Sequence, residues 1–212
     1  GTMLEVRYRN LLLGSRVGAA RMLVGLPALE QTDWSRLHHA YGRATDTPSH
    51  LLALLEEDPK GRENAFRHLW SAVIHQGTPW TATGPVALVI AGLLADERID
   101  RGDESIRADL MAFLVRVAEA SDMPASSVKE LEDLAAYDLE PFLDAEDDDA
   151  IYEDEDAANA LYARSYLGCV EVVPVLVGVM LEGLDSPEPH VRANASMGAA
   201  TLARTAALRG AA

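Results

Sequence analysis

The sequence predicts an all-α protein, and three observations support that fold class. Ala and Leu dominate, while aromatic residues make up only 6% of the 212-residue chain, a composition that favours helices over sheets. Signals that start and stop helices recur at short intervals along the chain. No segment shows convincing alternation of apolar and polar residues at period two, which a half-buried strand would need. We therefore expect about nine or ten helices joined by short loops.

The first expected helices are delimited by capping residues, prolines and glycines. Thr32 or Asp33 can cap a helix that closes at Gly42, because a short polar side chain satisfies free N–H groups and glycine terminates helices. Asp58 can cap a later helix that ends at Gly77 for the same reasons. The stretches expected to be helical in this half are 32–42, 46–59, 58–77 and 83–98.

The C-terminal half continues the pattern of short helices. In the stretch 103–121, apolar residues from Ile106 to Val117 recur on one helical face. The segment Val170–Met180 is rich in β-branched residues, but its length, its proline and its helical neighbours predict a buried helix rather than a strand. The stretches expected to be helical are 103–121, 126–143 with a break near Pro141, 156–168, 172–184 and 189–208.

The acidic charge is concentrated in the middle of the chain. Residues 96–156 carry 22 acidic and five basic side chains, whereas the remainder carries 12 acidic and 13 basic ones. The net charge of −16 is therefore a property of the middle third. Because an acidic domain repels phosphate, we expect no direct binding of nucleic acid.

A layout of helix, acidic-proline turn, arginine and alanine recurs along the chain. Aligning Arg62 with Arg192 places Ala65 over Ala195. Arg107 occupies the same position in a third copy, and a fourth copy is poorer. The spacing is irregular but lies within the range of a two-helix repeat.

This layout resembles the HEAT repeat, most closely in "SPEPHVR" (Ser186–Arg192) and more loosely in "DPKGR" (Asp58–Arg62). "WSRLHHAYG" (34–42) and "LWSAVIHQGT" (69–78) are similar to stretches in a group of actinobacterial HEAT-like proteins. The resemblance implies a right-handed α-solenoid of about four degenerate helix pairs that binds other macromolecules. It carries no catalytic residues over to this chain, and it implies that the repeat arginines contact the preceding turn.

The expected domain organisation has two parts. Residues 1–30 are interpreted as a tag remnant followed by a capping helix or leader, and 31–212 as one HEAT-like domain with an acidic insertion at 144–156. No apolar run is long enough to span a bilayer. The single cysteine, Cys169, cannot form an intrachain disulfide, which favours a reducing, cytoplasmic compartment.

One candidate binding surface follows the helix that begins after Pro59. Four polar residues at helical spacing are expected on the face opposite the apolar stripe, and the turn after them forms a lip with an exposed tryptophan. A hydrated face without a ligand is the competing interpretation. A metal site is not expected, because adjacent His38 and His39 diverge on a helix and zinc needs three or four converging ligands. The candidate residues are Asn64, His68, Ser71, His75, Gln76 and Trp80.

The acidic segment 144–156 supplies a second candidate surface. Read as a calcium-binding loop, it has Asp149 where the tight turn requires glycine. We therefore expect a solvated, mobile insertion that could bind a cationic partner. The candidate residues are Asp147, Asp148, Asp149 and Glu153.

These observations favour a non-enzymatic protein-binding module without a cofactor, whose partner is a basic protein. A specific version is an inhibitor or immunity-type protein that neutralises a basic toxin electrostatically. The alternative is an enzyme or enzyme-associated subunit, since HEAT-like repeats also occur in phycobilin lyase-type proteins and in a DNA glycosylase family. The glycosylase version requires a basic groove, for which this chain has the wrong charge.

Overall fold

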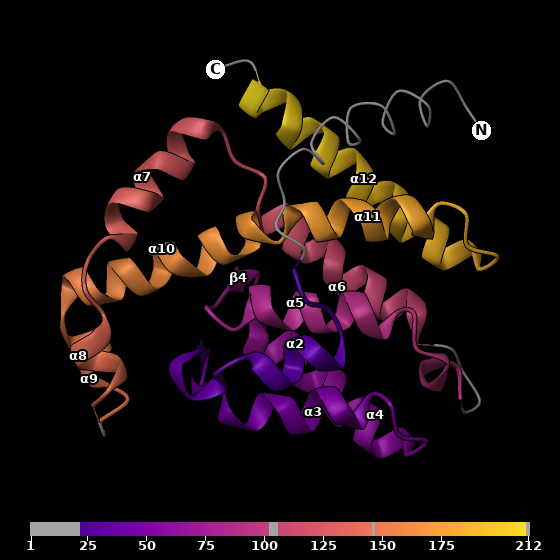
Figure 1. Cartoon of the computed structure of the whole chain (residues 1–212), viewed down its shortest axis with the longest axis horizontal. Coiled ribbons are helices and arrows are strands. Elements are labelled where there is room, and N and C mark those ends of the chain that lie inside the picture. The colour runs from indigo at the N-terminus through magenta and orange to yellow at the C-terminus, as the bar shows by residue number, and fades with distance from the viewer. Residues whose placement is uncertain (1–21, 102–105, 146, 211–212) are drawn as a thin grey trace.

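The computed structural model describes residues 22–101, 106–145 and 147–210 (Figure 1). The predicted all-α class is confirmed, because the described chain is predominantly helical and its only strands form two very short hairpins. Most of residues 1–30, including the expected leader, lies outside the described residues.

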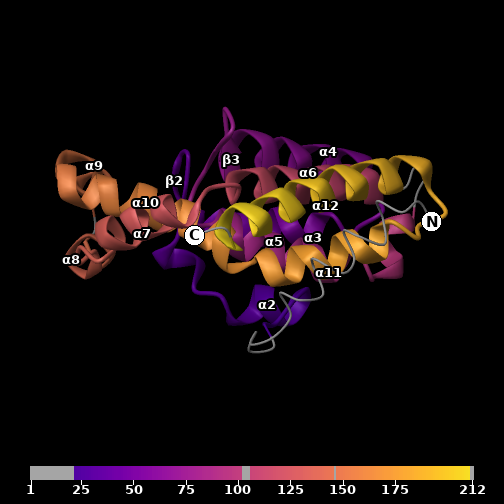
Figure 2. The same cartoon turned by 90° about the horizontal axis from the view of Figure 1, so that it is seen from above.

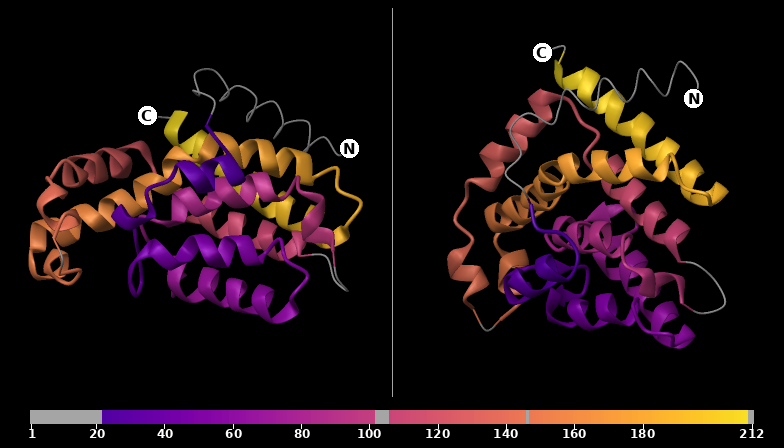
Figure 3. Two further views of the ribbon diagram at one scale, coloured as in Figure 1. Left: turned by 60° about the horizontal axis from the view of Figure 1, so that its bottom comes forward. Right: turned by 45° about the vertical axis from the view of Figure 1, so that its right-hand side comes forward.

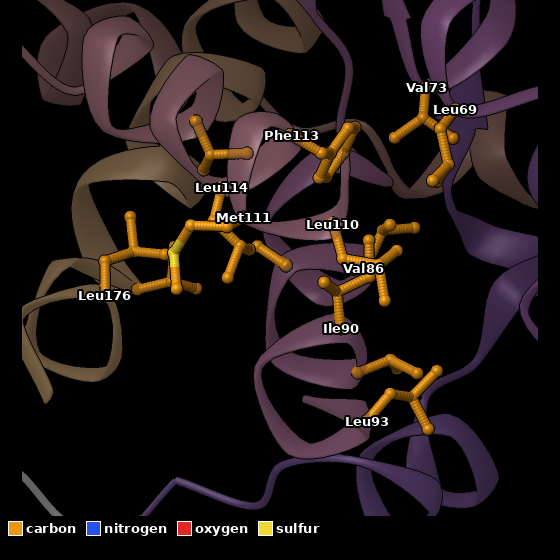
Figure 4. Packing of buried hydrophobic residues seen from close by; sticks show 14 of the residues in the cluster. Leu69, Val73, Val86, Ile90, Leu93, Leu110, Met111, Phe113, Leu114 and Leu176 are labelled. Carbon is orange, nitrogen blue, oxygen red and sulfur yellow. The ribbon is translucent and has the colours of Figure 1, made fainter. Parts of the chain in front are cut away.

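The body of the protein is a layered set of helices around one large apolar core. The helix α11 is the segment for which a strand was the competing interpretation, so the prediction of a buried helix there is confirmed. Leu110, Phe113 and Leu114 of α6 are fully buried between neighbouring helices (Figure 4). The body helices are α2 (Leu26–Gln31), α3 (Thr47–Ala53), α4 (Pro59–His68), α5 (Thr83–Leu93), α6 (Arg107–Ala120), α11 (Val173–Gly183) and α12 (Pro189–Gly210).

Four further helices form an arm beside this body (Figures 1 and 2). The long helix α10 (Glu155–Glu171) runs from the body into the arm, and α7 (Ala125–Ala135) packs along it. The short helices α8 (Glu140–Leu143) and α9 (Ala150–Glu153) close its far end, as both views of Figure 3 show. A second, smaller core buries Leu139, Ile151, Ala157, Ala160 and Leu161. The described part of the segment 144–156 contains α9 and the start of α10, and the mobility expected for it stays a prediction.

Two β-hairpins replace helix where the sequence predicted it. After a 3₁₀ turn at Trp34–Arg36, the strands β1 (His38–His39) and β2 (Gly42–Arg43) pair antiparallel. The expected helix 32–42 is therefore wrong, although Asp33 does cap the 3₁₀ turn by accepting from the Ser35 N–H. Gly42 has φ 121°, a conformation that favours glycine and turns the chain back after Tyr41.

The second hairpin follows α4. That helix continues as a π-helical stretch, Leu69–Val73, and then enters β3 (Ile74–His75), which pairs with β4 (Thr78–Pro79). Gln76 and Gly77 both have positive φ, 51° and 84°, as a two-residue hairpin turn of the type I′ family requires. The helix therefore stops before the predicted terminator Gly77, which serves as the second turn residue of the hairpin.

The three repeat arginines all donate to loop carbonyls. Arg192 donates to the carbonyls of Ser186 and Pro187 in the preceding turn, as expected. Arg107 contacts the preceding connection through Leu94 and Asp100. Arg62 differs, because it donates to the carbonyls of Arg98 and Arg101, which lie beyond the following helix. Each of the three arginines therefore has a structural role, which is to hold a loop through its backbone carbonyls.

Within the described residues, no single helix is both long and apolar enough to cross a membrane. The consecutive helices α10 and α11 satisfy that test only when taken together, and they are bent by 44° where they meet.

Candidate partner-binding site

The structure brings the two candidate surfaces of the sequence together. Trp80, from the lip after β4, meets Tyr152 of α9 with 6.4 Å between ring centroids and an interplanar angle of 79°. Between them and α10 lies a pocket of about 190 Å³. The lip and the acidic segment, far apart in the sequence, therefore form one surface, which we call the aromatic pocket. It is lined by Thr78, Pro79, Trp80, Tyr152, Ala158, Leu161, Tyr162 and Ser165.

The β3–β4 hairpin and its exit turn fix the position of Trp80. The backbone N–H of Trp80 donates to the hydroxyl of Thr83, which in turn donates to the carbonyl of Val73. Thr83 is fully buried, so this chain of hydrogen bonds is shielded from water. The indole Nε1 of Trp80 is itself buried and lacks a hydrogen-bond partner among the described residues.

On the other side, α9 presents Tyr152 to the pocket. Its neighbour Ile151 is buried in the second core and anchors the helix, while Tyr152 keeps 41% of its surface exposed. Burial raises the pKa of the Tyr152 phenol, and the negative charges of Asp149 and Asp148 raise it further. The ring therefore stands in a negative field that its own helix and the preceding loop create.

Arg43 holds this end of the arm against the first hairpin. Its guanidinium donates to the carboxylate of Asp148 at 2.5 Å and also to the carbonyls of Ser35, Phe142, Leu143 and Ala145. The Arg43 side chain is only 15% exposed, so these bonds are largely shielded from solvent. We call this group of contacts the Arg43 latch.

Three of the four acidic residues predicted to bind a partner face solvent. Asp147, Asp149 and Glu153 are exposed, and within the described chain none of them lies in an ion pair. Asp148 and Asp144, by contrast, pair with Arg43 and Arg36. A calcium loop is incompatible with this arrangement, because α9 occupies the middle of the segment and Arg43 already engages Asp148.

A separate histidine cluster lies between α3, α4 and the first hairpin. His39 Nε2 is 2.9 Å from Asp46 Oδ1, and His68 Nε2 is 2.9 Å from the Thr47 hydroxyl. His50 stacks on His68 with ring centroids 4.2 Å apart. Burial, reinforced by His50, lowers the pKa of His68 to about 4, so this imidazole is neutral at physiological pH. Burial alone would raise the pKa of Asp46, but the hydrogen bond from His39 holds it below its usual range.

Ligand atoms of His39, Asp46 and His68 lie within 4.8 Å of one another, as a metal site requires. The hydrogen bonds of His39, however, do not fit an ion. The Tyr41 backbone N–H donates to His39 Nδ1, so the proton of the neutral ring sits on Nε2 and points at Asp46. A metal bound at Nε2 would need the proton on Nδ1, where it would face another donor. These residues form a hydrogen-bonded structural network.

The row of polar residues expected on one face of α4 is divided by the structure. His68 is only 8% exposed, so its predicted exposure is wrong, because Thr47 and His50 of α3 cover it. Asn64 and Ser71 are half-buried, and their side chains bond to Arg67.

Two further candidate residues, His75 and Gln76, lie at the β3–β4 hairpin turn. His75 donates from Nδ1 to the Ser71 carbonyl and contacts the Tyr41 ring edge-on. Gln76 is exposed at the turn itself. Of the predicted lip, residues 76–80, the last three residues line the aromatic pocket: Thr78, Pro79 and Trp80.

The sequence analysis did not identify the other aromatic residues of the pocket. It also did not identify the residues that surround His68 in the histidine cluster. Tyr162 is 51% exposed on α10 and lines the pocket with Tyr152. The available signal was the presence of large aromatic residues in and beside an acidic run. His39 and Asp46 could not be paired, because the hairpin that orients them was expected to be a helix.

The chain matches no protein-family model, no curated protein and no solved structure. The class defined by the structure is a helical protein with an acidic, aromatic-lined arm.

Proposed function

We propose that this protein is a non-enzymatic protein–protein interaction module whose arm binds a basic partner through the aromatic pocket. The proposal includes the finer description of the fold, a right-handed α-solenoid of about four degenerate HEAT-like helix pairs with the arm departing from the repeat. The packing of α11 against α12 and of α12 against α6 supports it, as do the arginines at the turns.

The observation that carries the proposal is the contact of Trp80 with Tyr152 at one pocket, beside the exposed carboxylate of Asp149, whose charge raises the pKa of the Tyr152 phenol. Tyrosine and tryptophan are enriched at the energetic centres of protein interfaces, because they bury much area at little entropic cost. Exposed carboxylates around such a centre attract a basic partner and steer its association. A binding surface with aromatic residues at its centre and carboxylates around them is therefore suited to a basic protein.

A narrower version of the proposal is an inhibitor or immunity-type protein. Such a protein would cover the basic active surface of a toxin with the arm. The net charge of −17 over residues 96–156 supports long-range attraction to that surface.

The enzymatic alternative has its best support in the His39–Asp46 pair. Both ring nitrogens of His39 already have hydrogen-bond partners, and its exposed fraction is 4%. An imidazole in that state has no nitrogen available for a substrate proton. The geometry therefore favours the binding module.

The test is affinity capture from the host organism with cross-linking and mass spectrometry. The full chain should retain a basic protein, and Tyr162→Ala should lose it. Met197→Ala is the matched control, because Met197 is 56% exposed on α12 away from the arm. Retention of the same partner by Tyr162→Ala and wild type alike, or catalytic turnover by the purified protein, would contradict the proposal.

A further inference from the structure

We infer that the aromatic pocket receives an arginine side chain of the partner. This inference rests on the proposed function and specifies the chemistry of the group that enters the pocket. Three observations support it: the residues that line the pocket, the charges around the pocket, and the ion pairs and hydrogen bonds that the neighbouring basic residues already form.

The residues that line the aromatic pocket favour a ligand side chain with a planar or apolar surface. Three of the lining residues are aromatic, Trp80, Tyr152 and Tyr162, and the rings of Trp80 and Tyr152 meet edge to face. Ser165 is a polar lining residue, but its hydroxyl already donates to the Leu161 carbonyl. A volume of about 190 Å³ accommodates one long side chain. The pocket therefore suits a group that binds by packing and stacking.

The surrounding charge selects a cation. None of the eight lining residues is charged, and the exposed Asp149 and Glu153 flank Tyr152 in the sequence. Asp149 precedes Tyr152 by three residues, and its negative charge, after burial, raises the pKa of the Tyr152 phenol. A neutral or acidic side chain would gain nothing from this field, whereas a cation would.

Among the described residues, three basic side chains near the arm already have partners of their own. Arg43 is held in the latch, and Arg36 pairs with Glu140 and Asp144. Arg164 donates to the carbonyls of Ala135 and Tyr137 at the end of α7. Within the described part of the chain, Asp149 and Glu153 therefore have no basic partner, and a cation of the binding partner can complement their charge.

Arginine fits these requirements better than lysine. Its guanidinium is planar, stacks on aromatic faces and is weakly hydrated, so entry into the pocket costs less desolvation. At the rim, the same group can form paired hydrogen bonds with a carboxylate. The compact, strongly hydrated ammonium of lysine satisfies only the charge.

The inference is tested by titrating the full-length ¹⁵N-labelled protein with N-acetyl-L-arginine amide and following the indole N–H resonances. Trp34, whose indole donates to the Leu29 carbonyl, serves as an internal reference. The Trp80 resonance should shift and saturate with a dissociation constant on the order of millimolar, as expected for a ligand of this size. N-acetyl-L-citrulline amide, which is nearly isosteric but uncharged, should bind at least about fivefold more weakly. The lysine analogue should fall between them.

Variants locate the response. Tyr162→Ala removes an exposed ring and should abolish saturation of the Trp80 shift. Glu153→Gln should weaken binding about threefold to tenfold at low salt, whereas Glu30→Gln, on an exposed position of α2, should not. Equal shifts with arginine and citrulline, or shifts that Tyr162→Ala leaves intact, overturn the inference. If capture of a basic partner still depends on Tyr162 in that case, the proposed function stands and only the arginine assignment fails.

Discussion

The Arg43 latch predicts that one substitution will release the outer arm without unfolding the body. In Arg43→Met, the carboxylate of Asp148 and the carbonyls of Phe142, Leu143 and Ala145 lose their common donor. Arg43 is largely buried but Asp148 is 46% exposed, so the lost ion pair and the lost hydrogen bonds to the three carbonyls together should cost about 3–4 kcal/mol. Because the second core is small, most of this cost should appear as easier opening of α8 and α9.

Hydrogen–deuterium exchange with mass spectrometry measures that opening directly. Since about 1.4 kcal/mol corresponds to a tenfold change in an equilibrium, amide protection in α8 and α9 should fall by about 10²–10³-fold in Arg43→Met. Protection in α11 and α12 should change little. Arg43→Lys should fall between wild type and Arg43→Met, because it keeps the charge but loses the fork of donors.

Arg36→Met is the matched control for this experiment. Arg36 also reaches the arm, through Glu140 and Asp144, but all three side chains are substantially exposed at 34%, 65% and 68%. Exposed pairs of this kind contribute about 0–1 kcal/mol, so protection should fall less than about tenfold. Equal loss of protection in the two variants, or none in Arg43→Met, would refute the role of the latch.

Three further predictions concern the body. Burial lowers the pKa of His68 from its usual 6.5 to about 4 in the folded protein, so the unfolded chain binds more protons than the folded chain between these two pH values. The free energy of unfolding, measured by urea titration, should therefore fall by up to about 3 kcal/mol from pH 7 to pH 4. A His68→Asn variant whose stability fell just as steeply would disprove this. Gly84→Ala should cost about 1–3 kcal/mol, since a Cβ there would lie 2.7 Å from the Gly168 carbonyl oxygen, whereas Gly168→Ala, with open space within 4 Å, should be neutral or stabilising in thermal melts. Burial raises the pKa of the Cys169 thiol to about 12, so Ellman's reagent should modify it slowly in the native protein and rapidly in denaturant; equal rates would contradict its burial.

Much of the helical fold could be predicted because its signals are local. Asp58 caps α4 by accepting from the N–H groups of Lys60 and Gly61, and the apolar run of α11 is a helix as expected. The second hairpin was missed because Gln76 adopts a positive φ, which non-glycine residues rarely do. Nothing in the local pattern around Gln76 indicates that the helix should end there.

The candidate site was predictable only in pieces. Trp80 and the acidic residues were identified separately, but their proximity depends on a contact across 72 residues of sequence, from Trp80 to Tyr152. Such a contact follows from how the arm folds back, which helical periodicity does not encode. The exposure predicted for His68 was wrong because α3, a short neighbouring helix, covers that face of α4.

The separation of the two apolar cores has a consequence for how this protein can change over generations. The residues that shape the pocket's floor, such as Leu161, belong to the small core of the arm, whereas the large core of the body contains none of them. Substitutions that reshape the pocket therefore draw on the stability of the arm and spare that of the body. Substitutions in α9 and α10 can therefore change which partner the pocket binds without changing how the body of the protein folds.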